Sequence, residues 1–450
     1  MEICSVIVTN VRPADGSLAE ALDRRQREGT PVRVGLIGAG QMGTDILMQT
    51  AQMAGIEVVA AADAIVDNVL AARAIAGDAG RAVEVVKGTA AAAAAIARGR
   101  LAVSASFADV CRADGVDVVI DATGNPNVGA EVALATIAAR KHMVMMNVEA
   151  DVTIGAILSA RAREAGVVYT LGAGDEPSST MELVNFLRAL GYPIVAAGKG
   201  KNNAFNVDAT PDAYVVEAKR RNMNPRMLVE FVDGSKTMVE MVALANATGL
   251  VPDVPGMHGP NAPLATLHKT FCPKDEGGIL LRKGVVDFTV AKGVAPGVFA
   301  VAELRHPRLR ERMNDLALGE GPYYAFYRPY HLTSLEVPLS AAAAVLSGQS
   351  HMRPLPVPVA EVGAVAKRDL APGETLDAIG EYCYRGFALT RADADATAAL
   401  PLGLAQGAKV SRPIAKGERM TYANCTPDER LRIVQLRREQ DAMMRAALAA

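Results

Sequence analysis

The segment GLIGAGQMG, residues 35–43, constrains this 450-residue chain more than any other, because its three glycines have the spacing G-x-G-x-x-G. It begins in the β-branched run VRVGLI and precedes TDILMQTAQMAG, where apolar residues recur every three to four positions. This order is typical of a strand, a tight turn and a helix whose free N-terminal amides face a pyrophosphate. Gly38 then permits the turn, Gly40 lets the backbone approach the phosphates, and Gly43 allows close helix–strand packing. We therefore expect a dinucleotide site here.

Further cofactor contacts are expected at the ends of the following strands. Asp63 ends the run IEVVAAAD, where a carboxylate would accept the ribose hydroxyls and repel a 2′-phosphate, which favours NAD(H); a helix cap or solvated strand end is the alternative. Loops after parallel strands line the ligand crevice, which adds residues 121–129 and 147–149, although turns or caps explain these equally well. The cofactor-binding candidates are Gly38, Gly40, Gln41, Met42, Gly43, Asp63, Thr123, Gly124 and Asn147, with Asn125 and Glu149 beside them.

Strand and helix patterns alternate as far as residue 174, including a long alanine-rich helical region from Val66 to about Ala97. This alternation predicts an α/β fold with a Rossmann-type, doubly wound parallel sheet. Later segments, punctuated by proline and glycine, predict an α+β catalytic domain and then a small β-rich domain. The expected boundaries are 1–30 for an N-terminal helical arm with a helix at 17–29, 31–174 for the dinucleotide-binding domain, 175–352 for the catalytic domain, with a helix at 335–349 returning to the first domain, and 353–450 for the β-rich domain and a C-terminal helix.

The composition is that of an ordinary soluble globular protein, with 50% hydrophobic residues and a formal net charge of -2. We expect a small-molecule substrate, and neither a nucleic-acid nor a membrane partner. The five cysteines are scattered and form no C-x-x-C pair, which argues against a disulfide framework or a structural zinc site and favours the cytoplasm. A homodimer is the default expectation for such a protein.

Two clusters of charged residues are the first catalytic candidates. Asp175 and Glu176 follow the last strand of the first domain, where adjacent carboxylates suit a metal ion or a proton relay; they also suit a helix start. Lys199 and Lys201 lie between glycines in AGKGKNN, where ammonium groups can reach a phosphate or a carbonyl oxygen. The substrate-binding candidates Asn202 and Asn203 follow them directly.

A predicted helix at 235–249 supplies the remaining catalytic candidates, Lys236 and Glu240, which stand four residues apart as an oppositely charged pair. Apolar residues occupy most of this helix, so the pair should be largely buried, and Asn246 is a further candidate. In GEGPYYAFYRPYHL, residues 319–332, Arg328 and His331 are candidates for binding a sugar phosphate, unless the segment is a rigid domain interface. The spacing of histidines and carboxylates shows no metal-ligand pattern, which leaves a metal unassigned.

Several motifs together resemble known families. GLIGAGQMG, DATGNP, HMVMMNVEAD and VVYTLGAGDEP resemble the dinucleotide domain of homoserine dehydrogenase-like proteins. Through AAGKGKNN, DGSKTMVEMVALANATGL and GEGPYYAFYRPYHL, nearly the whole chain beyond residue 15 resembles the 1-deoxy-D-xylulose 5-phosphate reductoisomerase-like enzymes. VAKRDLAPGETLDAIG and RPIAKGERM resemble the SAF domain, a β-clip.

The reductoisomerase resemblance implies conversion of 1-deoxy-D-xylulose 5-phosphate to 2-C-methyl-D-erythritol 4-phosphate, in the isoprenoid precursor pathway. It also implies NADP(H), whereas Asp63 favours NAD(H), and a divalent metal ion held by carboxylates. One alternative is a homoserine dehydrogenase-like or sugar-acid dehydrogenase with simple hydride transfer. Another is a non-catalytic, dinucleotide-binding assembly protein whose SAF-like domain makes the contacts.

Overall fold

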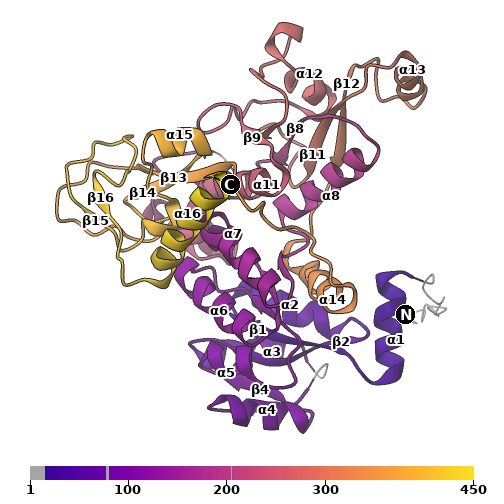
Figure 1. Ribbon diagram of the computed structural model, residues 1–450, viewed down its shortest axis with the longest axis vertical. Coiled ribbons are helices and arrows are strands. Elements are labelled where there is room, and N and C mark those ends of the chain that lie inside the picture. Colours follow the sequence, from indigo (N-terminus) through magenta and orange to yellow (C-terminus); the bar gives the residue numbers. More distant parts are fainter. Residues whose placement is uncertain (1–15, 78–80, 204, 450) are drawn as a thin grey trace.

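The computed structural model describes residues 16–77, 81–203 and 205–449, so Cys4 and positions 1–15 of the expected arm lie outside the described residues. Figure 1 shows the N-terminal region below, the middle of the chain above, and the yellow C-terminal region at the left. The C-terminal region contacts both of the others, because its strands pack on helix α11 (Ser235–Thr248) and its last helix packs on helix α7 (Val148–Glu164).

A parallel sheet of seven strands forms the N-terminal region, in the order β3-β4-β2-β1-β5-β6-β7. This confirms the expected doubly wound α/β fold. The chain adds strands outward from β1 in one direction and then in the other, so the crevice for a ligand lies beyond the carboxyl ends of β1 and β5. The strands are β1 (Val32–Ile37), β2 (Ile56–Ala62), β3 (Val83–Val85), β4 (Leu101–Ser104), β5 (Val118–Asp121), β6 (His142–Met145) and β7 (Tyr169–Leu171).

Helices cover both faces of this sheet, because successive strand residues point to opposite sides. In β5, for example, Val118 and Ile120 join one buried apolar cluster and Val119 joins the other. The helices are α1 (Leu18–Glu28), α2 (Gln41–Ala51), α3 (Val66–Ile75), α4 (Thr89–Ala97), α5 (Phe107–Arg112), α6 (Pro126–Ala138) and α7. Helix α1 has the expected caps, Ser17 and Gly29.

The prediction of one long alanine-rich helix from Val66 to about Ala97 is wrong. Helix α3 ends at Ile75, and Val83–Val85 forms the edge strand β3, which pairs with β4 before helix α4 begins. The short alternating segment Val-Glu-Val gains backbone hydrogen bonds from its neighbour, and a helical pattern in the sequence does not reveal such a partner.

A second sheet, of five strands, carries the middle of the chain, in the order β12-β11-β8-β10-β9. Strands β8, β9 and β10 are parallel, whereas β11 runs antiparallel to β8 and β12. Helices α8 and α11 pack on this sheet. Short 3-10 helices are labelled η. The elements are α8 (Glu176–Ala189), β8 (Ile194–Gly200), η1 (Pro211–Tyr214), α9 (Val215–Arg220), α10 (Pro225–Val232), α11, β9 (Val251–Pro252), η2 (Leu264–Thr266), α12 (Leu267–Thr270), η3 (Lys274–Glu276), β10 (Val285–Thr289), β11 (Val298–Glu303), α13 (Pro307–Asp315) and β12 (Tyr323–Arg328).

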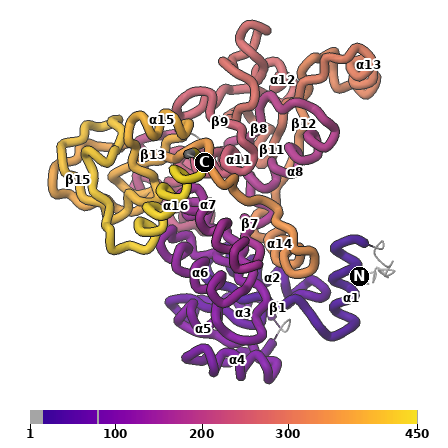
Figure 2. The backbone as a smooth tube through the Cα atoms, in the orientation of Figure 1, coloured from indigo at the N-terminus to yellow at the C-terminus, as the bar shows by residue number. Residues whose placement is uncertain are grey.

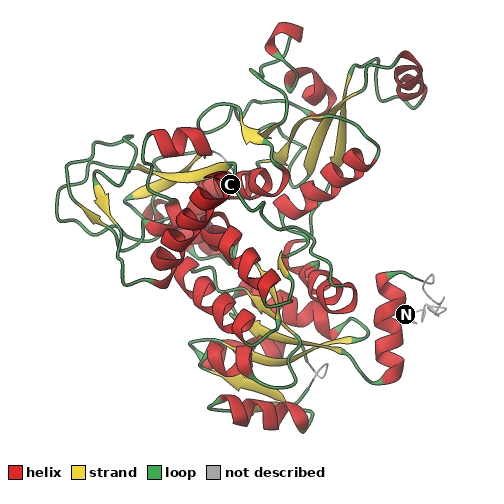
Figure 3. Cartoon of the chain, in the orientation of Figure 1, coloured by secondary structure: helices red, strands yellow, loops and turns green. Residues whose placement is uncertain are grey.

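After the turn η4 (Thr333–Leu335), helix α14 (Val337–Ser347) returns to the first sheet and packs on β1, β5 and β6, beside α1 and α2 (Figure 2). The C-terminal region consists mainly of loops, with one pair of seven-residue strands, one pair of two-residue strands and a long last helix (Figure 3). Its elements are β13 (Ala360–Ala366), β14 (Tyr384–Thr390), α15 (Arg391–Ala396), η5 (Leu402–Leu404), β15 (Lys409–Val410), β16 (Cys425–Thr426) and α16 (Arg432–Ala449). Among the helices of the described ranges, none is long and apolar enough to cross a membrane.

A buried carboxyl group makes the stability of the first domain sensitive to pH. Asp151 of α7 accepts a hydrogen bond from the Tyr169 hydroxyl at 2.8 Å, and burial raises the pKa of Asp151 to about 7. The folded state therefore binds a proton more tightly than the unfolded state between about pH 4 and 7, and stability falls as the pH rises through this window.

We expect Asp151→Asn to remove this penalty, of up to roughly 4 kcal/mol, because asparagine keeps an acceptor for Tyr169 without a charge. Melting temperatures at pH 5 and pH 8 test this, with exposed Asp114→Asn as the control. The stability of the variant relative to the wild type should increase with pH. An equal difference at both pH values would contradict the prediction.

Candidate active site

The glycine loop after β1 has the shape that a pyrophosphate needs. Gly38 has a φ of +92°, and a Cβ added there would lie 2.7 Å from the Ala122 carbonyl oxygen. A Cβ on Gly43 would lie 1.9 Å from the Gly38 carbonyl oxygen, whereas one on Gly40 would meet no atom within 4 Å. Helix α2 starts at Gln41 without a side-chain cap, so its first amides are free for phosphate oxygens. The loop thus fits a dinucleotide.

Asp63, at the end of β2, is tied to this loop. Its Oδ2 atom accepts a hydrogen bond from the Ala39 amide at 2.9 Å, and its Oδ1 atom accepts from the Ile65 amide at 2.9 Å and from Asn68 Nδ2 at 3.1 Å. Because a carboxylate has about four acceptor positions, Asp63 can still accept a ribose hydroxyl. Its negative charge would repel a 2′-phosphate at the same place.

We expect Asp63→Asn to raise the affinity for NADPH relative to NADH by about tenfold, which corresponds to 1.4 kcal/mol. Dissociation constants of both cofactors, measured by fluorescence titration, provide the test. Exposed Asp67→Asn, on the neighbouring helix, is the control. An unchanged ratio in the Asp63 variant would contradict a role in cofactor choice.

The other cofactor candidates lie in two different settings. Gln41 is exposed and Met42 half-buried at the start of α2, and exposed Gly124 follows β5. Thr123 follows the same strand, and its buried hydroxyl has no hydrogen-bond partner within the described ranges. Asn147 is buried and caps α7 through the Ala150 amide, at 3.1 Å. Cofactor contact by these residues stays a prediction.

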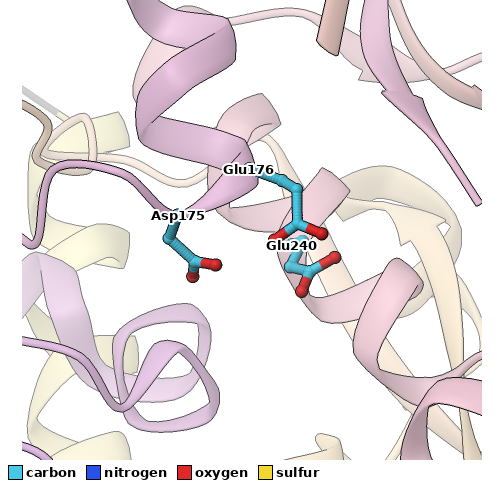
Figure 4. Close-up of side chains that lie close together, drawn as sticks. All are labelled: Asp175, Glu176 and Glu240. Atoms are coloured by element: carbon cyan, nitrogen blue, oxygen red, sulfur yellow. The ribbon is translucent and has the colours of Figure 1, made fainter. Parts of the chain in front are cut away.

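Three carboxylates from two helices converge at the start of α8. Asp175 precedes this helix, Glu176 begins it, and Glu240 comes from the second turn of α11 (Figure 4). One oxygen atom of each lies within 4.8 Å of those of the other two. The sequence showed no such triplet, because folding brings Glu240 to its two partners from a distant segment. All three are among the sequence candidates.

Two lysines balance part of this negative charge. Lys199 of β8 forms ion pairs with Glu176, at 2.7 Å, and with Glu240, and its side chain is 5% exposed. Lys236 pairs with Glu149 of α7, with Nζ and Oε1 3.0 Å apart. Lys236 and Glu240, four residues apart on α11, thus have different partners, because Lys199 lies beside Glu240 and Glu149 lies beside Lys236.

His331 completes the cluster, with Nε2 3.4 Å from Glu176 Oε1 and Nδ1 3.0 Å from the Gly174 carbonyl oxygen. The cluster thus combines the ends of β7 and β8, the starts of α7, α8 and α11, and the segment after β12.

The cluster shifts the pKa values of its members in opposite directions. Burial, together with the neighbouring Glu176, raises the pKa of Asp175 to about 7 and that of Glu240 to about 8. Burial also opposes ionisation of Glu176, but Lys199 and His331 outweigh it and hold the pKa of Glu176 below its usual range. Burial disfavours the charged form of Lys236, yet Glu149 and Asp175 outweigh it and raise the pKa of this lysine.

The donor set fits a divalent cation. Carboxylate oxygens are the ligands that Mg²⁺ and Mn²⁺ prefer. The Glu240 Oε1 atom is buried and has no hydrogen-bond partner among the described residues, and such an atom costs free energy unless a ligand satisfies it. Four carboxylates, Glu149 included, also lie beside two lysines and His331 in the described part of this cluster.

The remaining candidates, apart from the exposed Asn202, form hydrogen bonds outside the carboxylate cluster. Lys201 donates to the carbonyl oxygens of Asn203, at 2.9 Å, and Phe231, at 2.7 Å, and burial lowers its pKa to about 8. Asn202 is exposed. The Oδ1 atom of Asn203 accepts from Arg221, and that of Asn246 accepts from the amides of Val359 and Ala360.

Arg328 is held by acidic side chains. It forms two hydrogen bonds with Glu336, at 2.7 and 2.9 Å, and others with Glu182 and Ser179. The expected phosphate clamp at Arg328 would have to displace these partners. Sequence analysis missed Glu336, and nothing in its spacing indicates this contact.

The middle of the chain matches a known family. The sequence model described as "Oxidoreductase DRL, catalytic domain" matches residues 174–337, which include the three carboxylates and both lysines of the cluster. No curated protein sequence matches the chain.

Solved structures of distant dehydrogenases are also similar. A probable dehydrogenase from Thermotoga maritima is 14% identical, with 71% of this chain and 90% of that one covered and a TM-score of 0.40. A putative myo-inositol dehydrogenase from Sinorhizobium meliloti 1021 has the same identity and coverage and a TM-score of 0.39. A scyllo-inositol dehydrogenase from Lactobacillus casei, solved with NAD(H) and scyllo-inositol, is 13% identical, with 60% and 73% covered and a TM-score of 0.36. The oxidoreductase catalytic domain, joined to a Rossmann-type sheet with a dinucleotide loop, makes this chain an NAD(P)-dependent oxidoreductase.

Proposed function

We propose that this oxidoreductase reduces a small phosphorylated keto-sugar with a divalent cation at Asp175, Glu176 and Glu240, and that 1-deoxy-D-xylulose 5-phosphate is the first substrate to test. The observation that carries the proposal is the convergence of these three carboxylates within 4.8 Å. Such a site suits a substrate with adjacent keto and hydroxyl oxygens, because both oxygens are hard ligands. The named substrate comes from the reductoisomerase resemblance.

The position of the cluster relative to the dinucleotide loop supports this reading. Asp63 would hold the adenosine half of the cofactor over β2, and the pyrophosphate would cross the start of α2. The nicotinamide half then extends toward β5 and β6. Asp175 follows β7, two strands from β5, and at about 4.8 Å per strand this is roughly 10 Å.

In the proposed reaction one carbon–carbon bond of the substrate breaks and another forms, and hydride from the reduced nicotinamide then adds to the resulting aldehyde carbon while a proton adds to its oxygen. When bound, the cation would polarise the keto and hydroxyl oxygens. Lys236 keeps its proton at neutral pH because Glu149 and Asp175 raise its pKa, so it can donate a hydrogen bond to an oxygen that gains negative charge. Asn202, which is exposed, stays the candidate for the phosphate, and His331, beside Glu176, stays a candidate for binding the substrate near the cation.

A dehydrogenase with simple hydride transfer, homoserine dehydrogenase-like or acting on a sugar acid, is the second candidate. The contact that favours it is Lys199, held between Glu176 and Glu240. Burial opposes its charge, but the two carboxylates outweigh burial and raise the pKa of Lys199, so its ammonium group can hold a substrate oxygen without a metal. A non-catalytic assembly protein is disfavoured, because the matched family domain is a catalytic one. A homodimer and an SAF-like role for residues 353–450 stay proposals.

The test is oxidation of NADPH and of NADH by the purified protein with 1-deoxy-D-xylulose 5-phosphate, with and without a chelator, followed by identification of the product. Formation of 2-C-methyl-D-erythritol 4-phosphate, lost with the chelator and restored by Mn²⁺, would support the proposal. Tight cofactor binding without turnover of this substrate would contradict the named substrate and leave an oxidoreductase that acts on another compound. Turnover of a hydroxy acid unaffected by chelator would favour the second candidate.

A further inference from the structure

The turn between α10 and α11 sets the position of the two site residues on α11. Asp233 Oδ1 accepts a hydrogen bond from the amide of Ser235 at 2.9 Å, and Ser235 is the first residue of the helix that carries Lys236 and Glu240. Gly234 has a φ of +86°, and a Cβ there would lie 2.3 Å from the ring of Phe205. Because one residue separates Asp233 from Ser235 and a hydrogen bond joins them, a displacement of Asp233 would displace the first turn of α11.

A lysine of the C-terminal region holds this turn from outside the catalytic domain. Lys367 follows β13, and its Nζ atom lies 3.0 Å from Asp233 Oδ2 and donates to the Glu381 carbonyl oxygen at 2.7 Å. The side chains of Lys367 and Asp233 are 2% and 0% exposed. Removing one partner of so buried a pair leaves the other charge uncompensated, which is strongly unfavourable.

The same region holds α11 at two more points. The Gly386 amide of β14 donates to Ser235 Oγ at 2.8 Å, at the first residue of the helix. Near the other end, Asn246 Oδ1 accepts from the amides of Val359 and Ala360, at 3.0 and 2.9 Å. The C-terminal region therefore contacts α11 near both of its ends, at Ser235 and Asn246, and the site residues Lys236 and Glu240 lie between these two contacts.

We propose that Lys367 is a positioning residue of the active site, which fixes the positions of Glu240 and Lys236 through its contact with Asp233. The C-terminal region is thereby part of the catalytic unit. The inference rests on the proposed function in that Glu240 is taken as a cation ligand. Lys367 itself touches neither substrate nor cofactor.

The experiment compares Lys367→Met with the wild type in Mn²⁺ binding, followed by electron paramagnetic resonance, and in NADH binding. We expect Mn²⁺ affinity to fall by roughly 10–100-fold, the range seen for groups that orient metal ligands, while NADH affinity is unchanged. Exposed Lys409→Met, in the same region, is the control and should bind Mn²⁺ like the wild type. A folded Lys367→Met protein that binds Mn²⁺ like the wild type overturns the inference, even if its melting temperature falls.

The double variant Lys367→Met with Asp233→Asn removes both charges and keeps an acceptor for the Ser235 amide. If Lys367 acts through Asp233, the double variant recovers most of the Mn²⁺ affinity, and this also holds if Lys367→Met alone does not fold. A folded double variant that binds Mn²⁺ weakly overturns the inference.

Failure of the proposed function is distinguishable from failure of this inference. If the wild type binds no Mn²⁺, the metal proposal fails, and the comparison is then made by hydrogen exchange of the amides of residues 235–241. Faster exchange in Lys367→Met, reversed in the double variant, supports the positioning role without reference to the metal. Equal exchange in all three proteins overturns it.

Discussion

Replacing Glu240 by glutamine is expected to lower turnover by roughly 10²–10⁴-fold, the loss typical for a group that acts directly on a reacting centre. Glutamine keeps the shape of Glu240 but removes one of the three carboxylates, and it leaves Lys199 with Glu176 as its one anionic partner in the cluster. The binding of Mn²⁺ should weaken as well. Affinity for NADH should be unchanged, because the glycine loop follows β1 of the seven-stranded sheet, whereas Glu240 lies on α11.

Steady-state rates with the accepted substrate, together with Mn²⁺ and NADH titrations, measure these effects. Exposed Glu311→Gln on α13 serves as the control, since its side chain is 59% exposed and pairs with Arg308 on the same helix. A Glu240 variant that turns over at the wild-type rate would place the chemistry elsewhere. Equal loss in both variants would indicate a general loss of folded protein.

Replacing Gly43 by alanine is expected to lower both the free energy of unfolding and the affinity for NADH. The added Cβ would lie 1.9 Å from the Gly38 carbonyl oxygen, so the start of α2 must move away from the end of β1. Overpacking of this kind costs roughly 1–3 kcal/mol. The displaced helix would also move its free amides away from the pyrophosphate.

Gly40→Ala is the matched comparison, because its Cβ meets no protein atom within 4 Å. We expect this variant to unfold like the wild type but to bind NADH at least about tenfold more weakly, or 1.4 kcal/mol, since the methyl group would stand where the phosphates approach. Thermal denaturation with and without NADH separates the two effects. Wild-type NADH affinity in Gly40→Ala would show that the cofactor does not approach the loop there.

Local patterns in the sequence predicted much of the first domain. The glycine spacing and the alternation of strands and helices depend on backbone geometry and periodic burial, and both are visible in a short window. The prediction of a helical region between Val66 and Ala97 was wrong because strand β3 forms by pairing with β4. A short stretch of sequence does not show that partner.

The sequence indicated the individual residues of the candidate site, but it did not indicate the contacts between them. Asp175, Glu176, Lys199 and Glu240 were identified one by one, and the fold brings them together. The partner of Lys236 is Glu149, 87 positions away, rather than the glutamate one helical turn further on. Sequence distance carries no information about such contacts, because they depend on how α7, α8 and α11 pack.

The return of α14 to the first sheet has a consequence for synthesis of the chain. Val337, Ala341 and Ala342 of this helix complete an apolar cluster that otherwise comes from α1, the first sheet, α2 and α3. A ribosome reaches this helix 166 residues after the end of β7, since β7 ends at residue 171 and the helix begins at residue 337. At about 5–20 residues per second this takes roughly 10–30 s. For that interval the nascent first domain leaves an apolar strip of its sheet uncovered, so this is the stage at which a chaperone would bind it most readily.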